Sequence, residues 1–426
     1  MKSFQSKQIP RVAAFLLCLI MLGTAVAGCG TKKTIQASTL AQPAAVKPGD
    51  TDHELSGSFR RSLWDFAFKT SGAALPADGD KNALYSPISL YYALAMLAEG
   101  SAGKTKEDLR KFMEVPGTTD LGKELRNLYA LMLHEGESEE QIANAVWFKH
   151  DLGGNVGQSW LDQLANQFYA SAFKVDFSDE NTPSIMSQWV EQQTRGKIKP
   201  VIELDRDVLI VLMNTLYFKA EWDSLFLESE NSKKPFFAPS GQVGGVTFMN
   251  KVFTLGTYLA TDQFLASAIA MKNGSVDFIL PKEGVTPESI LANPALLKTI
   301  REETRQWAEV TFSVPKFTYR DKIDILEAME NLGLKRIVQG LPDFSVMLPG
   351  KDAEVGKITQ EAFIDLNEKG VEAAAYTEIQ VRDTSMEPDK IQKVEMNLDR
   401  PFIYVISDDA GVPLFVGVVN NPAAKD

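Results

Sequence analysis

The side chains that most often carry out catalysis or bind metals are scarce in this chain. Its 426 residues include three histidines, His53, His134 and His150, and two cysteines, Cys18 and Cys29. The histidines lie in unrelated local contexts, so they give little support to a catalytic triad or a histidine metal site. Two cysteines cannot form a four-cysteine zinc site or a disulfide framework. The chain therefore has few of the side chains with which it could catalyse a reaction itself.

Sequence motifs for nucleotide, phosphate and metal chemistry are absent as well. No GxGxxG follows a strand, and neither GxxxxGK[ST] nor HExxH occurs. No GxSxG occurs with a plausible partner histidine. Acidic side chains are plentiful, but a solvated acidic surface is the ordinary explanation for any pair of them. The net charge of −12 argues against a nucleic-acid partner, which needs a basic face.

Cys29 has the local sequence of a lipid-modified cysteine. Residues 1–11 are basic, and residues 12–27 form an apolar run that is short for a membrane-spanning helix. The run leads into Val26-Ala-Gly-Cys29, which resembles the processing box of bacterial lipoproteins. We expect an export signal over residues 1–28 and a lipid on Cys29 that anchors the protein to the outer face of a bacterial cell membrane. The domain would then be extracellular or periplasmic. The alternative is an ordinary signal peptide with an incidental cysteine.

The chain after Cys29 divides into two parts of different composition. Residues 30–57 contain few large apolar side chains and many small or polar ones. We therefore expect residues 29–57 to form a flexible tether. From about Ser58 the composition is globular and shows no linker-like break, so residues 58–426 are expected to form the folded domain.

The most unusual local sequence lies near the C-terminus, where residues 367–377 read NEKGVEAAAYT. Three consecutive alanines beside Val371 and Thr377 are uncommon in an exposed loop. No proline occurs between Gly370 and Glu387, so every backbone N–H there is available for a sheet ladder. The segment fits a surface loop that can insert into a sheet as a strand. A helical turn favoured by alanine is the alternative.

The elements around this segment indicate an α+β fold, with helices first and strands later. Ser86-Pro87 is a helix start, because serine caps helices and proline is favoured at the first helical position. Helices are expected over 58–71, 88–98, 109–112, 121–133, 160–169, 183–194 and 323–332. Strands are expected over 208–217, 236–237, 246–249, 276–280, 310–317, 363–366, 402–406 and 414–419.

Over residues 58–425 the chain resembles the serpin family. The resemblance rests on motifs that occur in the family's order, from Asn82–Ser89 (NALYSPIS) to Phe415–Gly417 (FVG). Between them lie matching motifs at 142–147, 185–198, 214–222, 314–317, 367–375 and 399–402. The resemblance implies an α+β fold of three β-sheets and eight or nine helices, with an exposed reactive-centre loop.

The resemblance also implies an activity, the suicide inhibition of a peptidase. The target peptidase, serine or alternatively cysteine, cuts the loop and stays attached as an acyl-enzyme while the loop inserts into the main sheet. The nucleophile belongs to the target, so the resemblance implies no catalytic residue, metal or cofactor in this chain, which we expect to be a monomer. The alternative is a non-inhibitory serpin that acts as a binding protein or a plain protease substrate. Small residues and the lack of proline in the hinge favour inhibition.

The resemblance assigns roles to three groups of residues. The hinge comprises Gly370, Val371, Glu372, Ala373, Ala374, Ala375, Tyr376 and Thr377; the family's inhibitors usually have Thr or Ser where this chain has Val371. Glu368, Lys316 and Trp222 match the site where the loop enters the sheet, and a conventional ion pair with a core aromatic is the alternative for them. Ser86, Ser89 and Asn214 match a polar cluster under the sheet, in which Gln360 replaces the usual histidine.

The reactive bond follows from the family's usual spacing after the hinge glycine. From Gly370 this spacing gives Thr384–Ser385, and a threonine suits an elastase-like or subtilisin-like peptidase. Arg382 lies just upstream and would invite a trypsin-like enzyme to cut Arg382–Asp383. A neighbouring bond is the third possibility.

Overall fold

The computed structural model describes residues 37–43, 45–47, 49, 54–133, 138–152, 155–204, 208–371 and 392–424, all within the compact unit Gln36–Asp426. Cys29, most of the hinge and both candidate reactive bonds lie outside these residues. In the described part, no helix is both long enough and apolar enough to cross a membrane.

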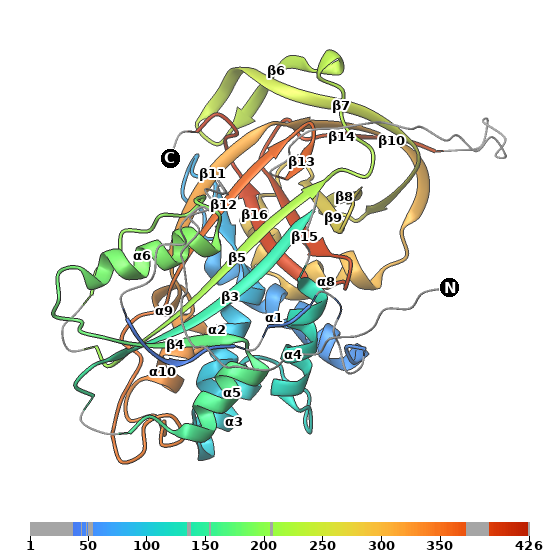
Figure 1. The fold of residues 1–426 in the computed structure, drawn as a ribbon. Coiled ribbons are helices and arrows are strands. Elements are labelled where there is room, and N and C mark those ends of the chain that lie inside the picture. The colour runs from blue at the N-terminus through green and yellow to red at the C-terminus, as the bar shows by residue number, and fades with distance from the viewer. Residues whose placement is uncertain are drawn as a thin grey trace, which may run out of the picture. The chain divides into compact units, whose positions relative to one another are not determined.

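Helices come first and strands later, which confirms the α+β class (Figure 1). The helices of the first half are α1 (Gly57–Ala74), α2 (Pro87–Glu99), α3 (Gly103–Phe112), α4 (Leu121–Met132), α5 (Gln158–Gln167) and α6 (Thr182–Gln193). Those of the second half are α7 (Pro287–Leu291), α8 (Pro294–Glu302), α9 (Ile325–Ala328) and α10 (Leu334–Val338), with 3₁₀ turns η1 (Glu228–Glu230) and η2 (Glu330–Leu332). The described helices exceed the implied eight or nine only by counting very short ones.

One sheet of seven strands runs across the face of Figure 1. In spatial order its strands are β1 (Ser38–Ala41), β4 (Ala170–Val175), β3 (Glu139–Lys149), β5 (Ile210–Glu221), β13 (Gly370–Val371), β12 (Thr359–Asn367) and β11 (Phe317–Asp324). Helix α6 packs against β5. An edge-to-face contact between Trp189 of α6 and Trp147 of β3 (6.4 Å between ring centroids) fixes the helix on this sheet.

The other strands form a nine-stranded sheet, in which eight strands follow one continuous path. In spatial order they are β14 (Lys393–Asn397), β10 (Gln306–Pro315), β7 (Gly241–Ala260), β8 (Phe264–Met271), β9 (Gly274–Pro281), β15 (Phe402–Asp408), β16 (Pro413–Val419) and β2 (Ala83–Tyr85), and β6 (Ser232–Ala238) also pairs with β7. The long strand β7 pairs with β6 and β10 along most of its length and with β8 at its end. Two of the three implied sheets are therefore joined through β7.

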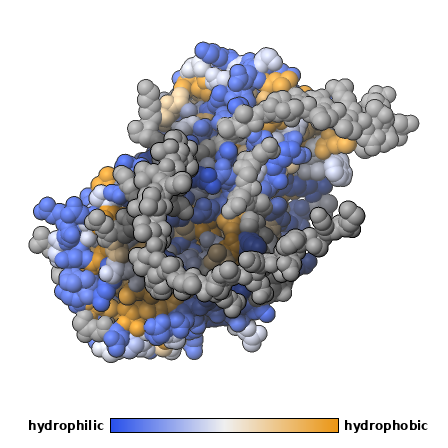
Figure 2. All heavy atoms as spheres, viewed as in Figure 1, coloured by the Kyte–Doolittle hydropathy of each residue, from blue (hydrophilic) through white to orange (hydrophobic). Residues whose placement is uncertain are grey.

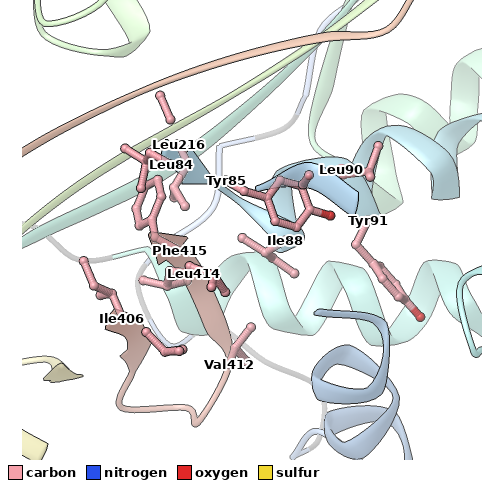
Figure 3. Close-up of a cluster of buried hydrophobic side chains, with 14 of the residues drawn as sticks. Leu84, Tyr85, Ile88, Leu90, Tyr91, Leu216, Ile406, Val412, Leu414 and Phe415 are labelled. Carbon is pink, nitrogen blue, oxygen red and sulfur yellow. The ribbon is translucent and has the colours of Figure 1, made fainter. Parts of the chain in front are cut away.

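Helix α2 lies between the two sheets, as its nearly all-apolar sequence predicts. Ser86 caps it by accepting a hydrogen bond from the Ser89 N–H, and Pro87 occupies the first turn. The helix contacts both β5 and β16. Figure 3 shows the resulting core, in which Leu216 of β5 lies in one apolar cluster with Tyr85 of β2 and Phe415 of β16.

The expected flexible tether differs from the structure at one place. Ser38–Ala41 form strand β1, which pairs antiparallel with β4 at the edge of the seven-stranded sheet. The side chains of β1 are exposed or half-buried. Backbone hydrogen bonds to a free sheet edge hold the strand, so the lack of large apolar side chains does not prevent it from forming.

The seven-stranded sheet contains a slot between β5 and β12. These strands have 12 and nine residues, respectively, but the strand between them, β13, has two. Gly370 pairs with Glu221 and Asn367, and Val371 pairs with Ala220 and Leu366. Below Val371, no described strand lies between β5 and β12.

Candidate site of loop insertion

The hinge starts inside the sheet, because its first two residues are β13. Gly370 has a φ of +148°, and a Cβ there would lie 2.0 Å from the Ala220 carbonyl oxygen, so only glycine fits. Val371 is buried at 4% exposure. The departure from the family's usual Thr or Ser therefore places an apolar side chain in an apolar environment. The other hinge residues, 372–377, lie outside the described part of the chain.

The structure brings together the three residues predicted for the site where the loop enters the sheet. The Lys316 ammonium lies 2.8 Å from a carboxylate oxygen of Glu368. The Trp222 indole N–H donates to the Asn367 carbonyl at 2.9 Å, and its backbone N–H donates to the Lys369 carbonyl at 2.9 Å. Trp222 is fully buried. This insertion site thus fixes residues 367–369, the turn that leads directly into the hinge.

Asn231 completes the insertion site, although no pattern in the sequence predicts it. Its side-chain N–H donates to the second carboxylate oxygen of Glu368 at 2.5 Å. Burial opposes ionisation of this carboxyl, but the hydrogen bonds from Lys316 and Asn231 outweigh burial and lower the pKa of Glu368. Asn231 follows the single turn η1, and no local pattern there points to a carboxylate 137 residues away.

The polar cluster under the sheet forms around Gln360. Its side chain accepts from the Ser86 N–H at 2.7 Å and donates to the Ser86 carbonyl at 2.8 Å. The Ser86 hydroxyl in turn donates to the Ser89 hydroxyl at 3.0 Å. Glutamine therefore ties β12 to the start of α2 through both halves of its amide, without a group that titrates near neutral pH.

Asn214 does not join this cluster, contrary to the prediction. Its side-chain N–H donates to Asn144 at 2.5 Å, and Asn144 donates to the Phe168 carbonyl at 2.9 Å. The reason is the register of the sheet, because Asn214 of β5 and Asn144 of β3 are directly opposite each other.

A narrow cavity opens in the slot beside Val371. It is lined by Thr194, Lys197, Ile198, Leu216, Tyr217, Phe218, Phe363, Ile364, Val371 and Phe415. Residues 194–198, which follow α6, form a strap over this cavity. Arg320 of β11 reaches over β12 and donates to the Lys197 carbonyl at 2.6 Å. The walls are mainly apolar, and the strap closes the outer side.

The reactive-bond candidates, Thr384–Ser385 and Arg382–Asp383, and the lipidation candidate Cys29 lie outside the described residues and stay predictions. Within the described part of the chain, no group of three or more His, Cys, Asp or Glu side chains is arranged to hold a metal ion.

Comparison with known proteins gives one consistent result. The family model "Serpin (serine protease inhibitor)" matches residues 61–422. A serpin-like protein of Thermococcus kodakarensis is 30% identical over 361 residues, covering 81% of this chain and 82% of the Thermococcus protein. Iripin-2 of Ixodes ricinus is 28% identical over 376 residues, covering 82% of this chain and 89% of its own. The native-state crystal structure of the thermophilic serpin tengpin is 26% identical, with a TM-score of 0.78, and covers 91% of this chain and 100% of that one.

Proposed function

This chain belongs to the serpin family, whose members are generally serine protease inhibitors, and we propose that it inhibits serine peptidases by covalent trapping. A peptidase with an elastase-like or subtilisin-like pocket cuts the loop at Thr384–Ser385 and forms an acyl-enzyme. The freed loop then enters the sheet from its hinge. This movement displaces the attached peptidase before the acyl bond is hydrolysed.

The slot between β5 and β12 carries this proposal. Both strands present backbone N–H and C=O groups toward the slot, and β13 uses only the uppermost ones. A strand that continues β13 would pair on both sides. Roughly a dozen new ladder hydrogen bonds at about 1 kcal/mol each give on the order of ten kcal/mol. A folded peptidase is stable by about 5–15 kcal/mol, so insertion can distort its active site.

The hinge sequence fits the walls of the slot. Val371 points inward and is buried. Side chains alternate along a strand, so Ala373, Ala375 and Thr377 would also point inward. The lining residues Leu216, Phe218 and Ile364 offer these small side chains an apolar surface.

We also propose that the protein is exported and held at a bacterial membrane by lipid on Cys29, with the domain outside the membrane. The sequence up to Cys29 supports this location. Anchoring would place the inhibitor where secreted peptidases reach the cell surface, and it would act there as a monomer.

Mixing the purified chain with elastase, subtilisin and trypsin tests the proposed function. A peptidase adduct that survives denaturing electrophoresis, with a released peptide that starts at Ser385, is the expected result. A released peptide that starts at Asp383 would assign the reactive bond to Arg382 and a trypsin-like target. Complete cleavage of the loop by all three enzymes without any adduct would contradict trapping and favour a non-inhibitory serpin.

A further inference from the structure

Three large apolar side chains are exposed on one face of the nine-stranded sheet. Trp307 of β10 is 67% exposed, and Leu255 and Val252 of β7 are 58% and 51% exposed. We call these three residues the sheet-face patch. In Figure 2 the hydrophobic groups of the described surface lie in separate areas, one of them at the upper right, where β7 and β10 run in Figure 1. Single exposed apolar residues are ordinary, but a group on adjacent strands points to an interaction surface.

The register of β7 and β10 places the three side chains on the same face. Trp307 is opposite Thr257, and Val252 is opposite Thr311. The alternate residues of β10, Ala308, Val310 and Phe312, are buried on the other face. A bulge interrupts the register between Ala308 and Val310, which adds a residue to β7 and turns Leu255 outward.

The patch lies where the chain returns from the reactive-centre loop. Gln392, the first described residue after the loop, accepts a hydrogen bond at 2.7 Å from the Tyr258 hydroxyl. The same hydroxyl lies 2.6 Å from the side chain of Gln306, the neighbour of Trp307. The Gln392 carbonyl also accepts from the Glu309 N–H at 2.9 Å. Trp307 is therefore beside the point at which the loop rejoins the sheet.

From this placement we propose that the sheet-face patch is a docking surface for the peptidase that holds the reactive-centre loop. The inference rests on the proposed function. Gln392 is seven positions after Ser385, so the bond under attack lies at most about 25 Å from the patch end of β14. A peptidase of about 240 residues has a radius of gyration of about 18 Å and a diameter of about 45 Å. Its body can therefore reach the patch while its active site holds the loop.

The surroundings of the patch specify the chemistry of the contact. Thr257 and Thr311 flank the apolar residues, and Lys393 of β14 pairs with Glu309 of β10 at 3.0 Å. These two charges neutralise each other, and Glu395 of β14, opposite Thr311, adds one exposed carboxylate to the rim. A tryptophan with a polar rim is the usual centre of a protein–protein contact. The complementary surface is an apolar segment beside the peptidase's active-site cleft, not a strongly charged one.

The test compares three forms of the full chain: wild type, Trp307→Ala/Leu255→Ser, and the control Val201→Ser. Val201 is 76% exposed and lies outside the patch, so its substitution removes exposed apolar surface elsewhere on the molecule. Because all three positions are exposed, we expect unchanged thermal midpoints. The probes are elastase and subtilisin whose nucleophilic serine is replaced by alanine, and the readout is the dissociation constant of each complex.

The comparison uses whichever inactive peptidase, elastase or subtilisin, has the lower dissociation constant with wild type. For that peptidase we expect the dissociation constant of the double variant to be about tenfold higher than that of wild type, and that of the control to be unchanged. Equal dissociation constants for wild type and double variant would overturn the docking surface, as would the absence of any measurable complex with wild type. Active peptidases separate the two proposals. If wild type gives no adduct while the double variant still loses affinity, trapping fails and docking stands.

Discussion

At the scale of single residues, Asp408 makes the stability of the fold depend on pH. This carboxyl group ends β15, is 4% exposed, and accepts a hydrogen bond from the Val412 N–H at 2.7 Å. Burial raises the pKa of Asp408 from 3.8 to about 7, and Asp409 adds to the shift. Burial, followed by repulsion from Asp408, also raises the pKa of Glu140. Both carboxyls favour the protonated form in the folded state.

We therefore expect these two carboxyls to lower the free energy of unfolding as pH rises from about 4 to about 7. In this range each of them binds more protons in the folded state than in the unfolded state, and the slope is up to about 1.4 kcal/mol per pH unit for one group. Asp408→Asn keeps an acceptor for Val412 and should flatten the slope. Urea unfolding at pH 4.5 and pH 7.5 measures this. Asp262→Asn, an exposed carboxyl before β8 that contributes to neither shift, is the control; an unchanged slope in Asp408→Asn would contradict the prediction.

The insertion site could be predicted from the sequence only because its residues belong to motifs that occur in the same order as in the serpin family. It identified Trp222, Lys316 and Glu368, which the structure brings together. It did not predict Asn231, and it assigned Asn214 to the wrong cluster. Each of these amides binds the polar group that the folded structure brings nearest, Glu368 for Asn231 and Asn144 for Asn214. Such pairings depend on the three-dimensional arrangement and leave no local pattern in the sequence.

At the scale of elements, the direction of each hinge side chain decides whether β13 can lengthen. Ala373→Glu would place a charge in the apolar slot, whereas Ala374→Glu, the matched control, would place it outward. We expect Ala373→Glu to be cleaved without forming an adduct and Ala374→Glu to trap as wild type does. The fraction of peptidase recovered as adduct on denaturing gels measures this. Equal trapping by both variants would contradict the assigned direction.

The sequence predicted elements with long apolar runs better than those held by their backbone hydrogen bonds. Helix α2 and strands β15 and β16 form where expected. The helix expected over 323–332 is instead the end of β11, then α9 and η2, closed by Gly333 at a φ of +86°. Strand β1 could not be predicted, because its side chains are mostly exposed and backbone pairing with β4 stabilises it.

At the scale of the whole molecule, filling the slot should stabilise the entire fold. If insertion of the cleaved loop adds on the order of ten kcal/mol to the free energy of unfolding, the thermal midpoint should rise by roughly 10 °C or more for a domain of this size. Calorimetry before and after cleavage measures the shift. Ala373→Glu, cleaved in the same way, should show no rise. A cleaved wild type that melts at its original temperature would contradict insertion.

The strap over the slot makes the rate of loop insertion one of the factors that decide which peptidases are trapped. Residues 194–198 close the outer side of the cavity, and the Arg320 hydrogen bond to Lys197 holds them there. A loop that enters the slot must first displace this strap. Under the proposed mechanism, strap opening therefore competes with hydrolysis of the acyl-enzyme. A peptidase that hydrolyses its acyl-enzyme quickly escapes, and one that hydrolyses it slowly is trapped. Selectivity therefore depends on two rates, that of strap opening in this protein and that of deacylation in the peptidase.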